Sequence, residues 1–382
     1  MPDPLVGRSV TLDGAVAADV AAAEAAIARL DVEATTLVDT ESLARILLRA
    51  ESVASSRIEG LQVGARRLLR AEAARELGEA PSDVTATEVL GNIDAMVFAV
   101  EQVDRDRPIT EDLLLEIHRR LLAGSRLEEH GGRVRTAQNW IGGSDYNPCS
   151  AEFVPPPPEA VEELLSDLVR FANDDALPVV AQAAMVHAQF ETIHPFVDGN
   201  GRTGRALIHL VLRRRGLAVR VLPPVSLVLA AGSRDYVGGL TAARYRGPTK
   251  GAEAQTGMNR WIGRFAGACL RAVEDAEGFE HRARQIEAGW RSELGRVRAK
   301  SAVDLLLRAL LGAPVITVGS AADLIGRSFV QTNEAVARLV DASILKQVTI
   351  GRRNRAFEAP DVISAFMDLE RDLAVPGSPS DV

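Results

Sequence analysis

Residues 194–205 hold the densest group of reactive side chains in the chain, in the order His-Pro-Phe-Val-Asp-Gly-Asn-Gly-Arg-Thr-Gly-Arg. The apolar spacing that follows Arg205 predicts a helix that continues to Gly216. A glycine-bearing loop that enters a helix directs free backbone N–H groups and the positive end of the helix dipole at one point. The segment therefore predicts an anion-binding site with phosphate as its natural ligand.

Four side chains give this anion site a chemistry. Arg202 and Arg205 fall near the start of the predicted helix, where a cation opposes the helix dipole unless an anion is bound. Asp198 offers the carboxylate that Mg²⁺ uses together with phosphate oxygens. His194 can take up a proton near neutral pH. A base, a metal ligand, an anion cradle and cationic clamps together suit phosphoryl-type transfer.

This segment resembles the Fic family signature, HxFx(D/E)GNGRxxR, and matches it at every fixed position. Residues 136–143 (TAQNWIGG) resemble the flap of that family, and residues 187–191 (HAQFE) resemble the helix that leads into its motif. The resemblance covers roughly residues 85–220, and the helices upstream resemble the N-terminal extension of many bacterial members. It implies a mainly α fold, in which a Fic-type helical core carries a small β-hairpin flap.

The resemblance implies a protein adenylyltransferase. His194 would deprotonate a Tyr, Thr or Ser hydroxyl of a target protein, and that oxygen would attack the α-phosphate of ATP, so that AMP is transferred and pyrophosphate leaves. Asp198 would hold Mg²⁺, and the flap near residues 136–147 would pair with the target's backbone by strand addition. The residues implied to contact the phosphates are Gly199, Asn200, Gly201, Arg202 (β-phosphate), Gly204 and Arg205 (γ-phosphate).

The identity of the transferred group is a further question, because family members also transfer UMP, phosphocholine or a bare phosphate. The phosphorylating members carry Lys in place of the motif's second glycine. Gly201 stands at that position here, which favours nucleotidyl transfer. Phe196 is expected to be a core anchor of the loop, and His187 a structural histidine that supports the motif.

Residues 55–60 (SSRIEG) carry a second pattern. Ser55 and Glu59 are four residues apart and share one face of a predicted helix, and Gly60 suits the end of that helix. A carboxylate at this place can pair bidentately with an arginine. The pattern resembles the family's inhibitory motif, (S/T)xxxE(G/N), which implies that Glu59 pairs with Arg205, excludes the γ-phosphate and holds the enzyme inactive in cis.

The composition limits the class of protein. The 382 residues include 44 Lys plus Arg and 52 Asp plus Glu, so the formal net charge of −8 argues against a uniformly basic coat for nucleic acid or membrane. Two cysteines, Cys149 and Cys269, exclude a disulfide framework and a four-thiolate zinc site. The sequence shows neither a secretory signal nor an apolar run of about 18 residues, so we expect a cytoplasmic protein without a membrane span.

The last 70 or so residues predict a separate unit. Two short helices around Gly326 and a hairpin around Gly351 are typical of a winged-helix domain. The hairpin arginines Arg352, Arg353 and Arg355 favour DNA binding, but residues 300–382 carry 9 positive and 10 negative side chains, which fits protein docking or dimerisation as well. The predicted division is 1–84, a helical extension with the inhibitory helix; 85–220, the Fic core; 221–300, a helical extension or linker; 301–372, winged-helix-like; and 373–382, a tail.

Two functions stay open at this point. The first is a protein adenylyltransferase that Glu59 inhibits, with self-modification and homodimer formation also open. The second is a winged-helix DNA-binding regulator whose Fic core senses nucleotide and is catalytically weak. A P-loop NTPase is disfavoured because the sequence before Lys300 lacks the required glycines, and a zinc hydrolase because no HExxH pattern occurs.

Overall fold

The computed structural model describes residues 1–33, 40–79, 83–143, 147–350 and 354–372. In these ranges the chain is mainly helical, as expected, with one small antiparallel sheet of strand order β1-β3-β2. The strands are β1 (Val315–Ile316), β2 (Lys346–Ile350) and β3 (Asn354–Glu358). The helices are α1 (Gly14–Glu33), α2 (Thr40–Ile58), α3 (Ala65–Glu76), α4 (Val84–Gln102), α5 (Glu111–Leu122), α6 (Val161–Ala172), α7 (Val179–Ile193), α8 (Asn200–Arg214), α9 (Val225–Ala231), α10 (Ser233–Ala243), α11 (Ala252–Leu294), α12 (Ala302–Gly312), α13 (Val318–Ile325), α14 (Phe329–Asp341) and α15 (Pro360–Asp372).

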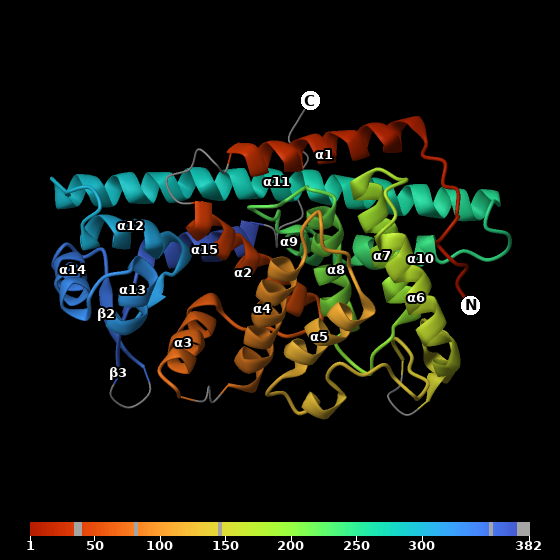
Figure 1. Ribbon diagram of the computed structural model, residues 1–382, viewed down its shortest axis with the longest axis horizontal. Coiled ribbons are helices and arrows are strands. Elements are labelled where there is room, and N and C mark those ends of the chain that lie inside the picture. Colours follow the sequence, from red (N-terminus) through yellow and green to blue (C-terminus); the bar gives the residue numbers. More distant parts are fainter. Residues whose placement is uncertain (34–39, 80–82, 144–146, 351–353, 373–382) are drawn as a thin grey trace.

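Helices α1 and α11 lie side by side along one long edge of the molecule (Figure 1). Helix α11 is 43 residues long and continuous. The Arg- and Glu-rich pattern of residues 272–308 predicts a separate polar helix there. This prediction is wrong, because the helix begins at Ala252 and ends at Leu294, with Gly295 as its cap. The buried side chains of Trp261 and Phe265 face the core, so α11 is a structural support for the helices that carry the site.

Helices α7 and α8 pack against each other in the centre of the core, and the loop between them is the motif identified in the sequence. Nearly every residue of α7 is buried, which is typical of a helix enclosed by others. The predicted helices before His194 and after Gly199 are thereby confirmed. The loop is held between two rigid elements, so its geometry is well defined.

The predicted C-terminal helices and hairpin are present. Helices α12, α13 and α14 and the small sheet enclose a second hydrophobic core. Strands β2 and β3 pair in register, with Lys346 opposite Glu358. Arg355 is exposed, whereas Arg352, Arg353 and the tail at 373–382 lie outside the described residues. The winged-helix domain and the five-part division of the chain stay predictions.

Helix α15 returns from this C-terminal unit to the main core. It packs against α2, α3 and α11, and Ala365, Phe366 and Leu369 join the main hydrophobic cluster. Helix α12 also contacts α2, and Arg49 of α2 donates from Nη1 to the carbonyl oxygen of Gly312 at 3.1 Å. The C-terminal unit is therefore in direct contact with the predicted inhibitory helix. Among the helices described here, none has the length and apolar character that crossing a lipid bilayer requires.

Candidate active site

His194 begins the loop between α7 and α8 and lines a cavity of about 1050 Å³. Its backbone has a left-handed conformation, with φ of 51°, and its N–H donates to the carbonyl oxygen of Phe190 at 2.8 Å. This conformation is uncommon for a non-glycine residue, and such backbone strain concentrates at functional sites. Burial lowers the pKa of His194 to about 4, so its imidazole is neutral at neutral pH and can accept a proton.

The loop is supported from below by a histidine on α5. The ring of Phe196, which is completely buried as expected of a core anchor, stacks on the ring of His118 with centroids 3.7 Å apart. The Nδ1 of His118 accepts the Gly132 N–H at 3.0 Å, so Nε2 carries the proton and donates to the carbonyl oxygen of Asp198 at 2.9 Å. Burial lowers the pKa of His118 to about 4 and keeps it neutral. His118 therefore fixes both ends of the loop that follows His194.

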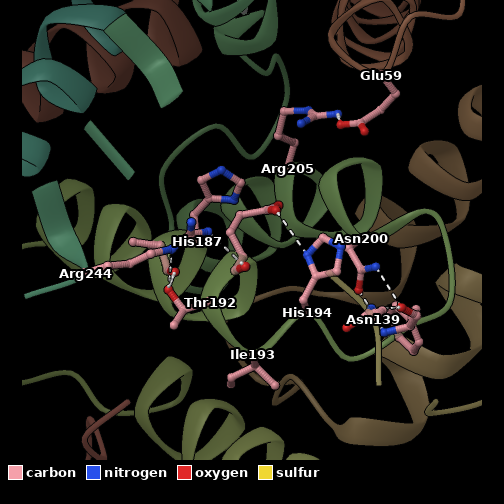
Figure 2. Close-up of polar contacts among 12 residues, drawn as sticks. Glu59, Asn139, His187, Thr192, Ile193, His194, Asn200, Arg205 and Arg244 are labelled. Carbon is pink, nitrogen blue, oxygen red and sulfur yellow. Dashed lines mark hydrogen bonds and ion pairs between the residues drawn. The ribbon is translucent and has the colours of Figure 1, made fainter. Parts of the chain in front are cut away.

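Asn200 closes the loop on itself. Its Oδ1 accepts the Phe196 N–H at 2.8 Å, and its Nδ2 donates to the Phe196 carbonyl oxygen at 2.9 Å. The resemblance implied that the Asn200 side chain contacts phosphate, but here both ends of the amide are engaged with the loop backbone (Figure 2). Asn200 thus shapes the cradle from behind.

The flap is tied to the loop by Arg135. This buried guanidinium donates from Nε to the His194 carbonyl oxygen at 2.9 Å and from Nη2 to the Pro156 carbonyl oxygen at 2.5 Å. Asn139 adds a bond from Nδ2 to the Phe196 carbonyl oxygen at 3.0 Å. One arginine therefore links the beginning of the flap, its end and the backbone of His194.

The flap itself is less regular than the expected hairpin. An antiparallel bridge joins Ile141 to Phe153, and no longer strand forms among the described residues of this segment. A short turn of 3₁₀ helix (Pro148–Ser150) follows, and residues 144–146 lie outside the described part. The flap therefore presents extended backbone next to the cavity, which Ile141 and Phe153 both line.

Asp198 and Arg202 lie at the N-terminal end of α8. The Asp198 side chain is 51% exposed, whereas that of Arg202 is 4% exposed, and Arg202 Nη2 lies 3.4 Å from Asp198 Oδ2. The described residues contain no group of three or more side chains that could enclose a metal. A single exposed carboxylate beside an anion site fits Mg²⁺, which commonly takes one carboxylate together with phosphate oxygens and water.

Arg205 is buried deep in the cavity and is engaged by α2. Its Nε donates to Ser55 Oγ at 2.9 Å, and its Nη2 donates to the Ser55 carbonyl oxygen and to Glu59 Oε1, each at 2.7 Å. Figure 2 shows the Arg205 side chain extended toward Glu59. The expected Glu59–Arg205 pair is observed, although it rests on one Glu59 oxygen rather than on a bidentate fork. Gly60 follows the helix end in a turn.

Glu59 also covers the first turn of α8. A Cβ atom on Gly201 would collide with the Glu59 carboxylate, so the glycine is what allows this close approach. About two helical turns further along, Glu51 of α2 lies 2.9 Å from Nε2 of His209 on α8, and both side chains are buried. Helix α2 thus follows α8 through successive polar contacts and places a carboxylate where the sequence predicts a bound phosphate.

Arg244 lines the inner wall of the cavity and has no role in the sequence analysis, and the expected structural histidine, His187, lies next to this wall. His187 Nε2 lies 2.8 Å from the Tyr236 hydroxyl, and burial lowers the pKa of His187 to about 3, as suits a structural histidine. Arg244 donates to the Glu191 carbonyl oxygen at 3.2 Å and stacks on the Phe153 ring of the flap, 3.8 Å from its centroid. Arg244 therefore links the flap to the last turn of α7.

Gly204 allows α7 and α8 to approach each other at this wall. A Cβ atom there would lie 2.5 Å from Glu191 Oε1 and 2.9 Å from Cδ1 of Phe190. We therefore expect Gly204→Ala to lower the free energy of unfolding by about 1–3 kcal/mol, because overpacking a core forces side chains from their preferred rotamers. Urea unfolding measures this, with Gly267→Ala on the open face of α11 as the control. Equal stability of the two variants would contradict the close packing.

The sequence predicts the loop, and the family resemblance predicts the Glu59–Arg205 pair. Neither indicates the residues that support the loop and its flanking elements. His118, Arg135 and Arg244 reach the loop from distant parts of the chain, and no local spacing indicates such contacts. Glu191 had a detectable signal, since it lies in the last turn of the predicted helix, three residues before His194.

Comparison with known proteins agrees with this geometry. The Fic/DOC family matches residues 108–212, and the N-terminal region of the Fic/DOC family matches residues 17–101. The protein adenylyltransferase fic-1 of Caenorhabditis briggsae is 38% identical over 118 residues, which cover 30% of this chain and 21% of that protein. The protein adenylyltransferase Fic of Nematostella vectensis is 32% identical over 162 residues, which cover 41% of this chain and 34% of that protein. The matches thus span a fifth to a third of these relatives' length.

The fold also has a relative among solved structures. The crystal structure of a Fic family protein from Desulfovibrio desulfuricans G20 superposes with a TM-score of 0.58 at 23% sequence identity. The superposition covers 91% of this chain and 97% of that one, so the similarity extends beyond the motif to the helices on either side of it.

Proposed function

Because the chain belongs to the Fic/DOC family, we propose that it is a protein adenylyltransferase, which transfers AMP from ATP to a hydroxyl group of a protein. One observation carries this proposal: a neutral imidazole, His194, lies in the same cavity as the buried cation Arg205 and the first turn of α8. A nucleoside triphosphate offers both an anion for the cation and an electrophilic phosphorus for a hydroxyl that the imidazole deprotonates.

In the proposed reaction His194 accepts the proton of the acceptor hydroxyl. The hydroxyl oxygen forms a bond to the α-phosphorus of ATP, the bond from that phosphorus to the bridging oxygen breaks, and pyrophosphate leaves. Arg202, Arg205 and the N-terminal turn of α8 hold the β- and γ-phosphates and so fix the direction of attack. His118 and Asn200 hold the loop backbone in place. They thereby keep His194 and the first turn of α8 in a fixed arrangement.

Asp198 would hold Mg²⁺ through its exposed carboxylate. When bound, the ion neutralises the charge of the phosphates. Asp198 lies next to Arg202 at the N-terminal end of α8, with its carboxylate exposed. His194 and Arg205 line the cavity further inside.

The proposed protein substrate binds along the flap. An extended segment with one bridge, from Ile141 to Phe153, leaves backbone groups available for strand addition by a target peptide. Arg135 connects this segment to the His194 backbone, so a peptide that docks on the flap is held at a constant distance from the base. The same reasoning allows a hydroxyl of a second copy of this chain to be the acceptor.

We further propose that Glu59 inhibits the enzyme in cis. Its carboxylate bonds to Arg205 and lies over Gly201, so it occupies both the cation and the space that a γ-phosphate requires. A carboxylate and a phosphate compete for one arginine, and ATP binds productively only when α2 releases it.

The C-terminal unit is proposed to be a winged-helix-like module that stabilises the inhibited state. Helix α15 contacts α2 through Arg57, which lies inside the inhibitory motif. Arg57 donates from Nη1 to the Glu370 carbonyl oxygen at 3.3 Å, and its Nη2 lies 3.6 Å from Glu370 Oε1. This contact favours docking within the chain as the unit's role, whereas the alternative of a DNA-binding regulator has only the wing arginines in its support.

Arg57→Gln is expected to raise AMP transfer by about fivefold, because the loss of one partly exposed ion pair weakens the docking of α2 by about 1 kcal/mol. The measurement is the initial rate of incorporation of α-labelled ATP into a substrate protein or into the chain itself. The matched control is Arg45→Gln, since Arg45 on α2 pairs locally with Glu41. A rate equal to that of the control would contradict the stabilising role of α15.

The donor is tested with α-labelled ATP, UTP, CTP and GTP in the presence of Mg²⁺, using the Glu59→Gly protein. Labelling from ATP in preference to the other three supports adenylyl transfer. Labelling from UTP, or none from any donor, would contradict the proposed activity.

A further inference from the structure

The side chain of Glu191 is a buried carboxyl group inside the cavity to which the proposed mechanism gives no role. It belongs to the last turn of α7, is 6% exposed and lines the cavity together with His194. Its Oε2 lies 4.0 Å from Nδ1 of His194, on the side of the imidazole away from Nε2. Within the described residues, Glu191 Oε1 and His194 Nδ1 are buried atoms that lack a hydrogen bond of normal geometry, and the Glu191 backbone also interacts with the imidazole.

The position of this carboxyl group is fixed by its surroundings. Its Oε1 lies against the backbone of Gly204, at the place where a Cβ atom would be. Arg244 holds the Glu191 backbone through its carbonyl oxygen at 3.2 Å. A buried carboxyl group without a full set of partners costs stability, and a catalytic role is one reason why such a group is kept. The imidazole of His194 lies within reach of it, with Nδ1 4.0 Å from Oε2.

Charged and titratable groups from three other parts of the fold face Glu191. Burial raises its pKa to about 7, and the nearby charges act on it in both directions, with Arg205 and Arg244 lowering the pKa and Glu59 raising it. The groups around it are His187 and His194 on α7, Arg205 on α8, Glu59 at the end of α2, Tyr236 on α10 and Arg244 after α10. Glu191 therefore changes its ionisation in the pH range where His194 stays neutral.

We propose that Glu191 is a positioning residue for His194: its carboxylate accepts the Nδ1 proton of the imidazole and so leaves Nε2 unprotonated toward the acceptor hydroxyl. The proposal rests on the transfer reaction proposed above. When the hydroxyl proton moves to Nε2 the imidazole becomes positively charged, and the carboxylate stabilises that charge while the oxygen–phosphorus bond forms and pyrophosphate leaves. The 4.0 Å separation is longer than a hydrogen bond, and such catalytic contacts commonly shorten when substrate binds.

Protonation of Glu191 reverses the arrangement. A neutral carboxyl group donates its proton to Nδ1, which places the ring proton of a neutral His194 on Nε2 and removes the base. The acid form of Glu191 is therefore inactive and the ionised form active. Activity is expected to increase as the pH rises through the pKa of Glu191, while His194, with a pKa of about 4, remains neutral throughout.

The first test measures directly which ring nitrogen of His194 is protonated, and it does not require catalytic turnover. The full chain is labelled with ¹⁵N-histidine, and the His194 resonances are assigned by their absence in His194→Gln. In the wild type we expect the protonated ring nitrogen to change from Nε2 to Nδ1 as the pH rises from 6 to 8, about one unit on each side of the pKa of Glu191. Glu191→Gln should keep one form across this range. The same pH course in both proteins would overturn the proposal.

The second test measures kcat against pH in the Glu59→Gly background. Glu191→Gln is expected to lower kcat by roughly 10- to 100-fold, to change the KM for ATP by less than about twofold, and to remove the rise of kcat with pH. Glu191→Asp keeps a carboxylate and should retain the rise at a reduced kcat. A purely structural role predicts instead that the rise persists in Glu191→Gln, and that result contradicts the proposal.

These experiments distinguish failure of the adenylyltransferase proposal from failure of the Glu191 proposal. If the Glu59→Gly protein transfers no nucleotide at all, the adenylyltransferase function is wrong, whereas the imidazole spectra still decide whether Glu191 selects the protonated nitrogen of His194. Thermal unfolding of Glu191→Gln provides the folding control. A folded variant with unchanged His194 resonances overturns the Glu191 proposal whether or not AMP is transferred.

Discussion

His194→Ala is expected to abolish AMP transfer, lowering the rate by about 10²- to 10⁴-fold, which is the usual contribution of a general base. The imidazole is the neutral proton acceptor of the cavity, and an alanine leaves the acceptor hydroxyl protonated at the moment of attack. The rate is measured as incorporation of α-labelled ATP, in the Glu59→Gly background so that the starting activity is high.

The control for this experiment is His281→Ala, because His281 lies exposed on α11, far along the chain from the motif. We expect its transfer rate to equal that of the parent. His194→Ala should still bind ATP with an affinity within a few-fold of the parent, since the proposed phosphate contacts are with Arg202, Arg205 and α8 instead. If the His194→Ala protein keeps more than about a tenth of the parent rate, His194 is not the base.

Glu59→Gly is expected to raise AMP transfer by about 5- to 150-fold, the range typical of a coupling free energy between two sites. Removing the carboxylate frees Arg205 and uncovers Gly201, so the γ-phosphate of ATP can take the place that Glu59 occupied. The increase is expected in kcat as well as in ATP affinity, because a misplaced triphosphate holds its α-phosphorus out of line with the attacking oxygen.

One control variant and one stability measurement define this effect. Glu41→Gly makes the same substitution at the exposed start of α2 and should leave the rate unchanged. Without ATP, Glu59→Gly should unfold at a lower temperature than the wild type, because the buried Arg205 loses its counter-charge, and ATP should restore more stability to it than to the wild type. A transfer rate equal to that of the wild type would show that Glu59 does not inhibit.

The sequence could predict the parts of the site that depend on local spacing. The segment from His194 to Arg205 fixes a loop and the first turns of a helix, so its residues come together whatever the rest of the fold does. Ser55 and Glu59 share a helix face for the same reason. Their contact with Arg205 came from the resemblance to a known family, and no spacing in this chain indicates it.

The parts that could not be predicted depend on contacts between distant segments. Arg135 reaches four backbone carbonyl groups, and that role follows only from the way the flap folds over the loop. The Asn200 amide turns toward Phe196 because the loop needs its backbone groups satisfied, so its side chain does not point at the cavity as a motif suggests. The return of α15 to Arg57 joins residues more than 300 positions apart.

Helix α11 shows a different limit. Its residues alternate between apolar and charged stretches, which suggested separate helices, but the helix crosses from the main core to the C-terminal unit without a break. The change in composition reflects what each stretch packs against: Trp261 and Phe265 face the main core, and Trp290 faces the second one. The composition of each stretch therefore indicated which side chains are buried, but it did not indicate where the helix begins and ends.

The most direct test of the account compares ATP labelled in the α-phosphate with ATP labelled in the γ-phosphate, using Glu59→Gly and the double variant Glu59→Gly/His194→Ala with Mg²⁺. We expect that protein is labelled from the α-phosphate alone, that intact mass increases by one AMP moiety per modified hydroxyl, and that the double variant is unlabelled. Label from the γ-phosphate, or equal α-label in the double variant, would contradict adenylyl transfer by His194.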